Sequence, residues 1–386
     1  ASGSVEFPSA SANIAYTGVL RAGHIPGFAD ASGHDKPVDF TGTITESLTE
    51  PAVSLGAKNI DFAAYGLSIR QGTLDLGFHL ERHGVKRSIR DGMARLESPQ
   101  CSYGGGPGLA VSCTAPFESN GFDDILFRDI AVSVPILGAK LTADMDYGRD
   151  TGKASLRGHV NFDELAATSA VYPHPFGGAL SASLRIERGN KPESLQIGAA
   201  GDWFHPTGLP EAAMRMAGDK VHAAVRLESG QDRIRIEDAR LELEVGTITG
   251  SGWQNKADRR FRLLLDTEAI DLAKTTAQKP GTMEGLLGLS ARLEGLPDDF
   301  SASGQAHIKG LAWDRLAVRS TKATFKAEHL PVRPLGTMSV VMSNGKKGPS
   351  LDGSLAYQYG DRVRRVEKAN FTPSKNRMRG SLEYRA

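Results

Sequence analysis

The eight residues Thr73-Leu74-Asp75-Leu76-Gly77-Phe78-His79-Leu80 decide the fold class, because apolar and other side chains alternate strictly along them. In a β-strand, successive side chains point to opposite faces, so the four large apolar residues share one face. One apolar face and one wet face are typical of antiparallel sheets, whereas strands of parallel sheets are buried on both sides. The stretch therefore predicts an antiparallel strand with an apolar face available for packing or binding.

The same period of two recurs along the chain and predicts further strands. Val221, Ala223, Val225 and Leu227 repeat it, and other runs are Ala12–Leu20, Val38–Ile44, Ala139–Tyr147, Ala154–Phe162, Phe261–Leu265, Leu287–Leu293 and Leu351–Tyr359. The phase slips at Glu237-Asp238, which predicts a β-bulge that keeps the apolar side facing one way. Helical signals are short and few: Asp163–Ala170, Pro210–Ala217 and Asp271–Gln278. The chain is therefore predicted to be all-β.

Composition and length narrow the class of protein. The 386 residues carry a net charge of +1, which gives no electrostatic argument for nucleic acid. No stretch approaches the roughly 18 apolar residues of a membrane-spanning helix. Because single compact cores stop growing near roughly 250–300 residues, we expect two domains or one elongated core. We favour a single elongated domain over residues 1–386, with repeat-like subdivisions near 150–190 and 268–285. A weak internal repeat places Leu180 and Leu289 at matching positions.

The search for catalytic chemistry returns no constellation. The chain lacks a nucleophile elbow, a phosphate-binding loop and a dinucleotide fingerprint, so we expect no enzyme, no cofactor and no metal. Asp123-Asp124 and Asp298-Asp299 lie beside Gly or Pro and indicate turns. A carbohydrate enzyme built on such a carboxylate pair is the weakest alternative. Trp203, Trp253 and Trp313 favour core anchors over a sugar-stacking platform.

A long sheet with one apolar face needs something to cover that face, either a second sheet or a ligand. Sequence alternation is the same in both cases, so an open lipid-filled groove and a closed sandwich both remain open. We take the alternating apolar residues as candidates for lining a lipid groove: Leu74, Leu76, Phe78, Leu80, Val221, Val225, Leu227, Ile234, Ile236, Leu241, Leu243, Phe261, Leu263, Leu265, Leu289 and Leu293.

The two cysteines, Cys101 and Cys113, bracket a Gly-Gly-Gly-Pro-Gly turn. An isolated, even pair across a turn predicts a disulfide and an oxidising compartment. Closing a loop of this size would contribute on the order of 3 kcal/mol. The alternative is two unrelated thiols in a reduced protein.

A family resemblance begins at Asp271–Ala327. Asp271-Leu272-Ala273, Gly285-Leu286-Leu287 and Ala291–Pro297 form one half of a cadence that Phe300–Gly304, Ile308–Leu311 and Leu316–Phe325 complete. The segment resembles the AsmA-like family of bacterial envelope proteins, which includes the TamB group, and Val221–Leu265 looks similar. A type II secretion component of related architecture, the N protein, is an alternative identity.

The resemblance implies a long, curved antiparallel sheet that forms an elongated apolar trough, taco- or solenoid-like, with a few short helices. It implies a non-enzymatic conduit or carrier that moves phospholipids between the inner and outer membranes of a Gram-negative envelope, or supports outer-membrane biogenesis. Phospholipid acyl chains would be the partner, together with inner- or outer-membrane proteins. No leader opens the chain, which begins Ala-Ser-Gly-Ser, and we expect one to have been removed. That would leave the periplasmic ectodomain of an inner-membrane-anchored protein. The alternative is a structural component of envelope assembly or type II secretion with a closed β-sandwich core.

Overall fold

The structure is a computed structural model of the chain. It describes residues 2–6, 13–20, 38–46, 50–64, 67–83, 86–103, 107–121, 124–148, 152–170, 174–188, 195–275, 283–313, 316–344, 350–360, 363–373 and 378–380. Its internal contacts divide the chain into two compact units, unit 1 over Ala1–Pro192 and unit 2 over Glu193–Ala386. Each unit is described by itself. The single elongated domain expected from the sequence stays a prediction.

Unit 1 is an antiparallel sheet in which each strand pairs with its neighbours in chain order. Its strands are β1 (Ser2–Glu6), β2 (Asn13–Leu20), β3 (Val38–Glu46), β4 (Pro51–Ala64), β5 (Leu67–His83), β6 (Lys86–Tyr103), β7 (Leu109–Asn120), β8 (Asp124–Val134), β9 (Ala139–Gly148), β10 (Lys153–Phe162) and β11 (Gly177–Arg188).

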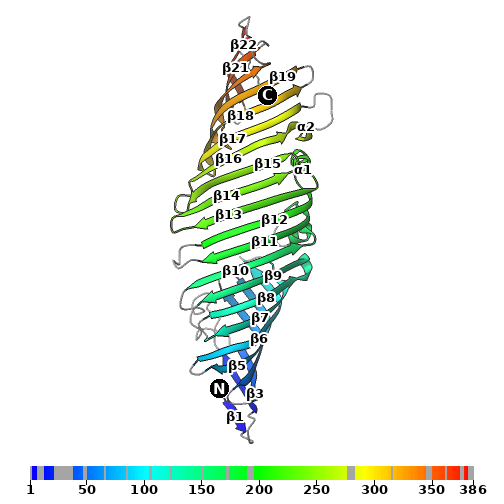
Figure 1. Ribbon diagram of the computed structural model, residues 1–386, viewed down its shortest axis with the longest axis vertical. Helices are drawn as coiled ribbons and strands as arrows, with labels where there is room; N and C mark the ends of the chain where they lie inside the picture. The colour runs from blue at the N-terminus through cyan, green and yellow to red at the C-terminus, as the bar shows by residue number, and fades with distance from the viewer. Residues whose placement is uncertain are drawn as a thin grey trace. The chain divides into compact units, whose positions relative to one another are not determined.

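Unit 2 repeats this meander, and Figure 1 shows its strands stacked in chain order like the rungs of a ladder. The strands are β12 (Leu195–Thr207), β13 (Lys220–Ser229), β14 (Arg233–Leu243), β15 (Gly246–Asn255), β16 (Phe261–Asp271), β17 (Met283–Leu296), β18 (Asp299–Trp313), β19 (Leu316–Leu330), β20 (Leu335–Ser343), β21 (Ser350–Gly360), β22 (Val363–Pro373) and β23 (Met378–Gly380).

These strands confirm the predicted all-β, antiparallel class. Every run predicted from period-two alternation lies within a strand or overlaps one closely. The predicted bulge is also confirmed: Arg226 pairs with Asp238 and Leu227 with Ile236, so that Glu237 is skipped. The extra residue keeps the apolar side chains before and after the bulge on the same side of the sheet. Ile236 pairs with Gly252 and Ala239 with Gly250, and these two glycines lie on one side of β15.

Short helical segments lie where one strand turns into the next. In unit 1 they are η2 (Pro135–Leu137) and η3 (Leu165–Ala170), and in unit 2 they are α1 (Glu211–Ala217) and α2 (Leu272–Thr275). The helical signals at 163–170, 210–217 and 271–278 are thus confirmed in position, with residues 276–278 outside the described ranges. Figure 1 shows α1 and α2 along one edge of the unit 2 sheet. Among the described residues, no helix has the length and apolar character needed to cross a membrane.

Candidate functional site

In unit 2 the strand register brings the predicted groove residues onto one face of the sheet. One row across the strands contains Leu227, Ile236, Leu263 and Leu293, which are joined through direct pairings and Gly252. Neighbouring rows hold the remaining candidates of the unit. These are Val221, Val225, Ile234, Leu241, Leu243, Phe261, Leu265 and Leu289. We call this surface the apolar face of unit 2.

Unit 1 has an equivalent surface around β5, the apolar face of unit 1. Leu74, Leu76 and Phe78 pair with Ala57, Leu55 and Val53 on β4, and Leu80 lies on the same side of the strand. Beyond them, the rings of Phe78 and Phe117 lie 6.2 Å apart, and those of Phe117 and Phe127 lie 5.8 Å apart.

Phe117 can reach toward Phe78 because the intervening strand β6 carries a glycine there. A Cβ atom on Gly92 would lie 2.7 Å from a ring carbon of Phe117, which is closer than real side-chain atoms approach. The missing side chain lets the Phe117 ring cover the backbone of β6. The result is a row of aromatic rings along the apolar face of unit 1.

The side chains of these faces are covered only in part. Leu76, Phe78, Leu227, Leu263 and Leu293 are all half-buried. Among the described residues, Val245 is the one large side chain that is fully buried. From β12 to β20 the apolar face of unit 2 measures roughly 40 Å by 20 Å, about 800 Å². Its side chains are partly exposed over this footprint, and a contiguous exposed apolar patch is typical of a binding surface.

At one end of the unit 2 strands the connections cover the sheet, in contrast to the open face. We refer to these strand ends as the closed edge. Five apolar residues there are buried to between 2% and 8% exposure, and we call them the rim cluster: Ala217, Val221, Val245, Ile270 and Leu272. Helices α1 and α2 contact each other at this edge, and the Asp271 N–H donates to the Val245 carbonyl at 2.7 Å. Val221 was predicted to line the groove, but at 8% exposure it offers almost no surface to a ligand.

The predicted disulfide between Cys101 and Cys113 is not formed in the structure, where both thiols are free. The register explains this, because Cys101 faces Leu109 whereas Cys113 faces Leu96. The positions 96 and 101 on β6 are about 16 Å apart at roughly 3.3 Å per residue, far beyond the roughly 7 Å that a disulfide allows. Both side chains are partly buried near the apolar face, and this burial raises the pKa of each thiol.

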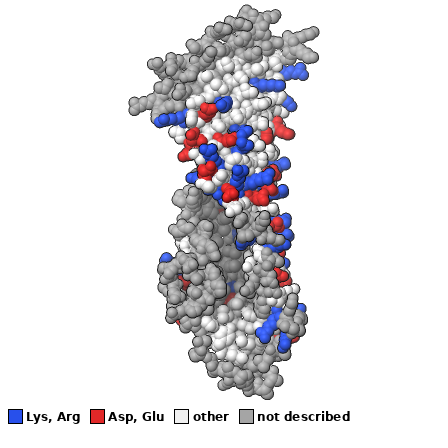
Figure 2. All heavy atoms as spheres, turned by 90° about the vertical axis from the view of Figure 1, so that its left-hand side faces the viewer, with Lys and Arg blue, Asp and Glu red and all other residues white. Residues whose placement is uncertain are grey.

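The opposite face of unit 2 carries ion pairs. Arg240 and Glu242 lie 2.7 Å apart, and Glu294 accepts hydrogen bonds from Arg262 and Arg292. The bonds from Arg262 and then Arg292 lower the pKa of Glu294. Figure 2, which views the left-hand side of Figure 1, also shows Lys and Arg mixed with Asp and Glu rather than gathered by sign. Such a surface favours water, which leaves the apolar face as the side open to hydrocarbon.

Trp253 lies on the charged face of β15 and not in a core. Its register partners are Arg235 and Arg262, and the Arg233 guanidinium lies 4.8 Å from the ring centroid. Its indole is therefore a platform for cations. Trp203 pairs with Val221 on the apolar side, and the side chain of Trp313 lies outside the described residues.

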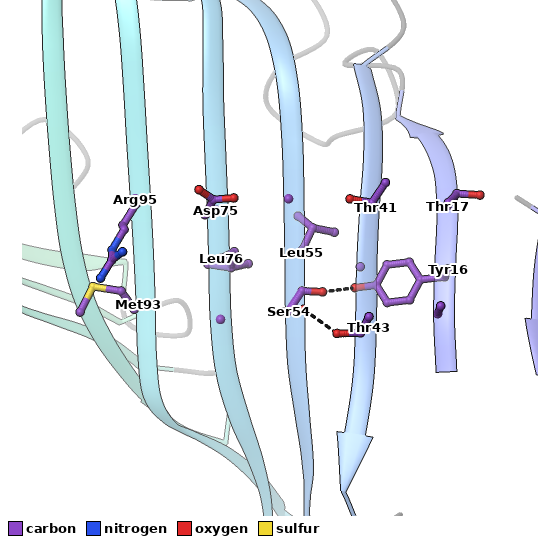
Figure 3. Close-up of a pocket in the computed structure, with 14 residues that line it drawn as sticks. Tyr16, Thr17, Thr41, Thr43, Ser54, Leu55, Asp75, Leu76, Met93 and Arg95 are labelled. Atoms are coloured by element: carbon purple, nitrogen blue, oxygen red, sulfur yellow. Dashed lines mark hydrogen bonds between the residues drawn. The ribbon is translucent and has the colours of Figure 1, made fainter. Parts of the chain in front are cut away.

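A groove of about 530 Å³ lies on the other side of the unit 1 sheet, across β2 to β6. Figure 3 shows that its lining residues come from these five neighbouring strands. Threonine, serine and glycine make up half of its lining residues, Asp75 and Arg95 contribute the charges, and Ala15 and Met93 add apolar surface. Two of its hydroxyl groups contact each other, since the Thr43 and Ser54 hydroxyls lie 2.7 Å apart. The Tyr16 side chain is on the other face, where Tyr16 pairs with Gly42 and its hydroxyl donates to the Ser54 carbonyl at 3.0 Å.

Sequence reasoning did not find this hydroxyl-lined groove. Thr41, Thr43 and Asp75 occupy the non-apolar positions of their strands, where such residues are ordinary. Only the pairing of Thr17 with Thr41, Thr41 with Gly56 and Gly56 with Asp75 places them in one row.

Comparison of the chain with models of protein families, with curated proteins and with solved structures finds no match. Within the described ranges, no group of three or more His, Cys, Asp and Glu side chains is arranged to hold a metal ion. The site is thus defined by geometry alone: two half-exposed apolar faces, one in each unit, and one hydroxyl-lined groove.

Proposed function

We propose that this chain is a non-enzymatic lipid-binding protein, a conduit or carrier for phospholipids, whose apolar faces hold the acyl chains. The observation that carries the proposal is the continuity of the apolar face of unit 2, from Ile197 on β12 to Met338 on β20, along which most large apolar side chains are only half-buried. The resemblance to AsmA-like proteins supports a role in the bacterial periplasm, between the inner and outer membranes.

The energetics of hydrocarbon burial suit this role. An acyl chain of about 15 methylenes gains on the order of 12 kcal/mol when it leaves water, at about 0.8 kcal/mol for each methylene. The attraction has no preferred direction, so a chain can move along a face of similar residues without one deep minimum. Leu227, Ile236, Leu263 and Leu293 form such a row across the strands.

A structural role in envelope assembly or type II secretion is the second candidate. In that interpretation a protein partner, and not lipid, covers the apolar faces. The closed sandwich core that we expected for this alternative finds no support among the described strands, which form a single antiparallel sheet in each unit.

Two neighbouring leucines on β16 allow a matched test. Leu263 belongs to the apolar face, whereas Leu264 points to the charged face and is 42% exposed. Native mass spectrometry of the purified wild-type protein should detect bound phospholipid. The same protein should transfer a fluorescent phospholipid between vesicles. Leu263→Asp should reduce both at least tenfold, because a carboxylate then meets the hydrocarbon. Leu264→Asp should behave as wild type.

Circular dichroism and urea unfolding separate binding from folding in both variants. A folded Leu263→Asp protein with full lipid binding would contradict the proposal, as would wild-type protein that carries no lipid and transfers none. If Leu263→Asp unfolds, Leu263→Ser is the replacement, with the same expected loss of lipid.

A further inference from the structure

We propose that the hydroxyl-lined groove of unit 1 binds a neutral saccharide. The proposal does not depend on the lipid function, because the groove lies on the opposite side of the sheet from the apolar face of unit 1. The alternation along β5 shows this: Asp75 and Gly77 line the groove, whereas Leu74 and Phe78 do not and belong to the apolar face. Leu76 borders the groove as the residue between Asp75 and Gly77, and its register partner is Leu55 of the apolar face.

The volume and walls of the groove fit a ligand of this class. Its size, about 530 Å³, falls within the range of small-molecule sites. The hydroxyls of Thr17, Thr41, Thr43 and Ser54 can each donate and accept hydrogen bonds, as sugar hydroxyls do. Between these groups, threonine methyl groups and glycine backbone give carbon surface for the C–H faces of a sugar ring.

Asp75 and Arg95 supply the charged groups that sugar hydroxyls bind well. They are register partners on β5 and β6, and both line the groove. A carboxylate accepts two hydroxyl hydrogen bonds, and a guanidinium donates several in a fixed geometry. Figure 3 shows Asp75 on the same row as Thr41 and Thr17, which places the carboxylate and the hydroxyls along one line across the strands.

Other ligand classes fit this groove less well. An acyl chain would displace water from the Asp75 carboxylate and the Arg95 guanidinium without replacing its hydrogen bonds, which costs free energy. An anion at Arg95 would meet the neighbouring carboxylate of Asp75. A peptide strand cannot extend the sheet here, because β3, β4 and β5 already pair on both sides.

Unit 2 offers an internal contrast. A groove of about 390 Å³ across β19 to β21 repeats the hydroxyl pair, with Thr324 and Ser339 2.7 Å apart. No carboxylate is among its described lining residues, and the cation at its side, Lys326, lies 2.7 Å from Glu328. We therefore assign one saccharide site for each chain, in unit 1.

Gly77 gives the most direct variant. A Cβ atom there would meet only the Val53 carbonyl, at 4.0 Å, so a larger side chain has room and projects into the groove. Full-length protein is titrated with maltohexaose, cellohexaose and chitohexaose by saturation-transfer NMR and calorimetry. At least one should bind saturably, with one site for each chain.

Gly77→Leu should abolish this binding, and Asp75→Asn and Arg95→Ala should each weaken it at least tenfold. Arg157→Ala, which removes an exposed charge on β10 outside the groove, should bind as wild type. Leu263→Asp should also keep full saccharide binding, which separates this proposal from the lipid proposal. No response to any of the three oligosaccharides would overturn the inference. So would a response that Gly77→Leu leaves intact, or binding of inorganic phosphate in place of the sugars.

Discussion

The rim cluster and the apolar face of unit 2 consist of the same residue types in opposite situations. On one strand, β16, Ile270 is 4% exposed within the rim cluster, whereas Leu263 is half-buried on the open face. The difference comes from the connections: α1, α2 and the turn at Val245 close the edge. Different residues of the same sheet can thus stabilise the fold and bind a ligand. The two roles can be tested separately by mutation.

The largest effect is expected from truncation in the rim cluster. Ile270→Ala removes buried methylenes in a closed environment and should lower the free energy of unfolding by about 2–5 kcal/mol. Leu263→Ala removes a half-buried side chain and should cost about 1 kcal/mol, because much of its surface already meets water. Urea unfolding of both variants gives the two values. Equal losses would mean that the face is as closed as the rim.

A smaller effect is expected at Gly304, where the open face is locally crowded. A Cβ atom there would lie 2.3 Å from the Ser290 carbonyl oxygen and 2.7 Å from the Phe325 ring. Gly304→Ala should therefore destabilise unit 2 by about 1–3 kcal/mol. Gly288→Ala is the matched control, because its nearest contacts are ordinary at 3.4 Å. A neutral Gly304→Ala variant would indicate that the face relaxes easily.

The apolar face of unit 1 can be examined through its thiols. Protein unfolded without reductant should titrate both cysteines with a thiol reagent, since Cys101 and Cys113 are free in the structure. In the folded protein the reaction should be slow, because burial raises the pKa of both thiols and less thiolate is present. Absence of titratable thiols after unfolding would restore the predicted disulfide and require a different register of β6 and β7.

The smallest effect concerns the charged face. Hydrogen bonds from Arg262 and Arg292 hold the pKa of Glu294 below its usual value. Their stabilising effect is therefore full above the pKa of the unfolded chain, about 4.3, and is lost as the pH falls through the lowered folded value. Arg262→Gln should move the Glu294 pKa upward, toward the usual value, in a carboxyl NMR titration. An unchanged pKa would show that Arg292 alone holds it.

The sequence predicts the sheet well, because alternation in strands such as β5 and β16 is a direct consequence of strand geometry. The bulge at Glu237-Asp238 could be found for the same reason, since one extra residue visibly reverses the phase. The candidates on β14, β16 and β17 share a face because the register joins consecutive strands in phase.

Other features of the site depend on which residues of different strands lie next to one another. The alternation of apolar residues within one strand does not give this information. Val221 has the pattern of a face residue, but it belongs to the rim cluster and is only 8% exposed. Cys101 and Cys113 flank a turn, yet the pairing of β6 with β7 offsets them along the strands. The residues of the row from Thr17 to Arg95 are ordinary for the solvent side of a strand. They form a groove only because strand pairing places them next to one another.

Strictly sequential pairing has a consequence for how each unit forms. Every strand closes only a hairpin with its predecessor, so the loop entropy lost at each step is small. Ordering can begin at any hairpin and spread outward one strand at a time, as in repeat proteins. For the same reason, evolution can lengthen or shorten such a chain by whole hairpins while the remaining pairs keep their partners.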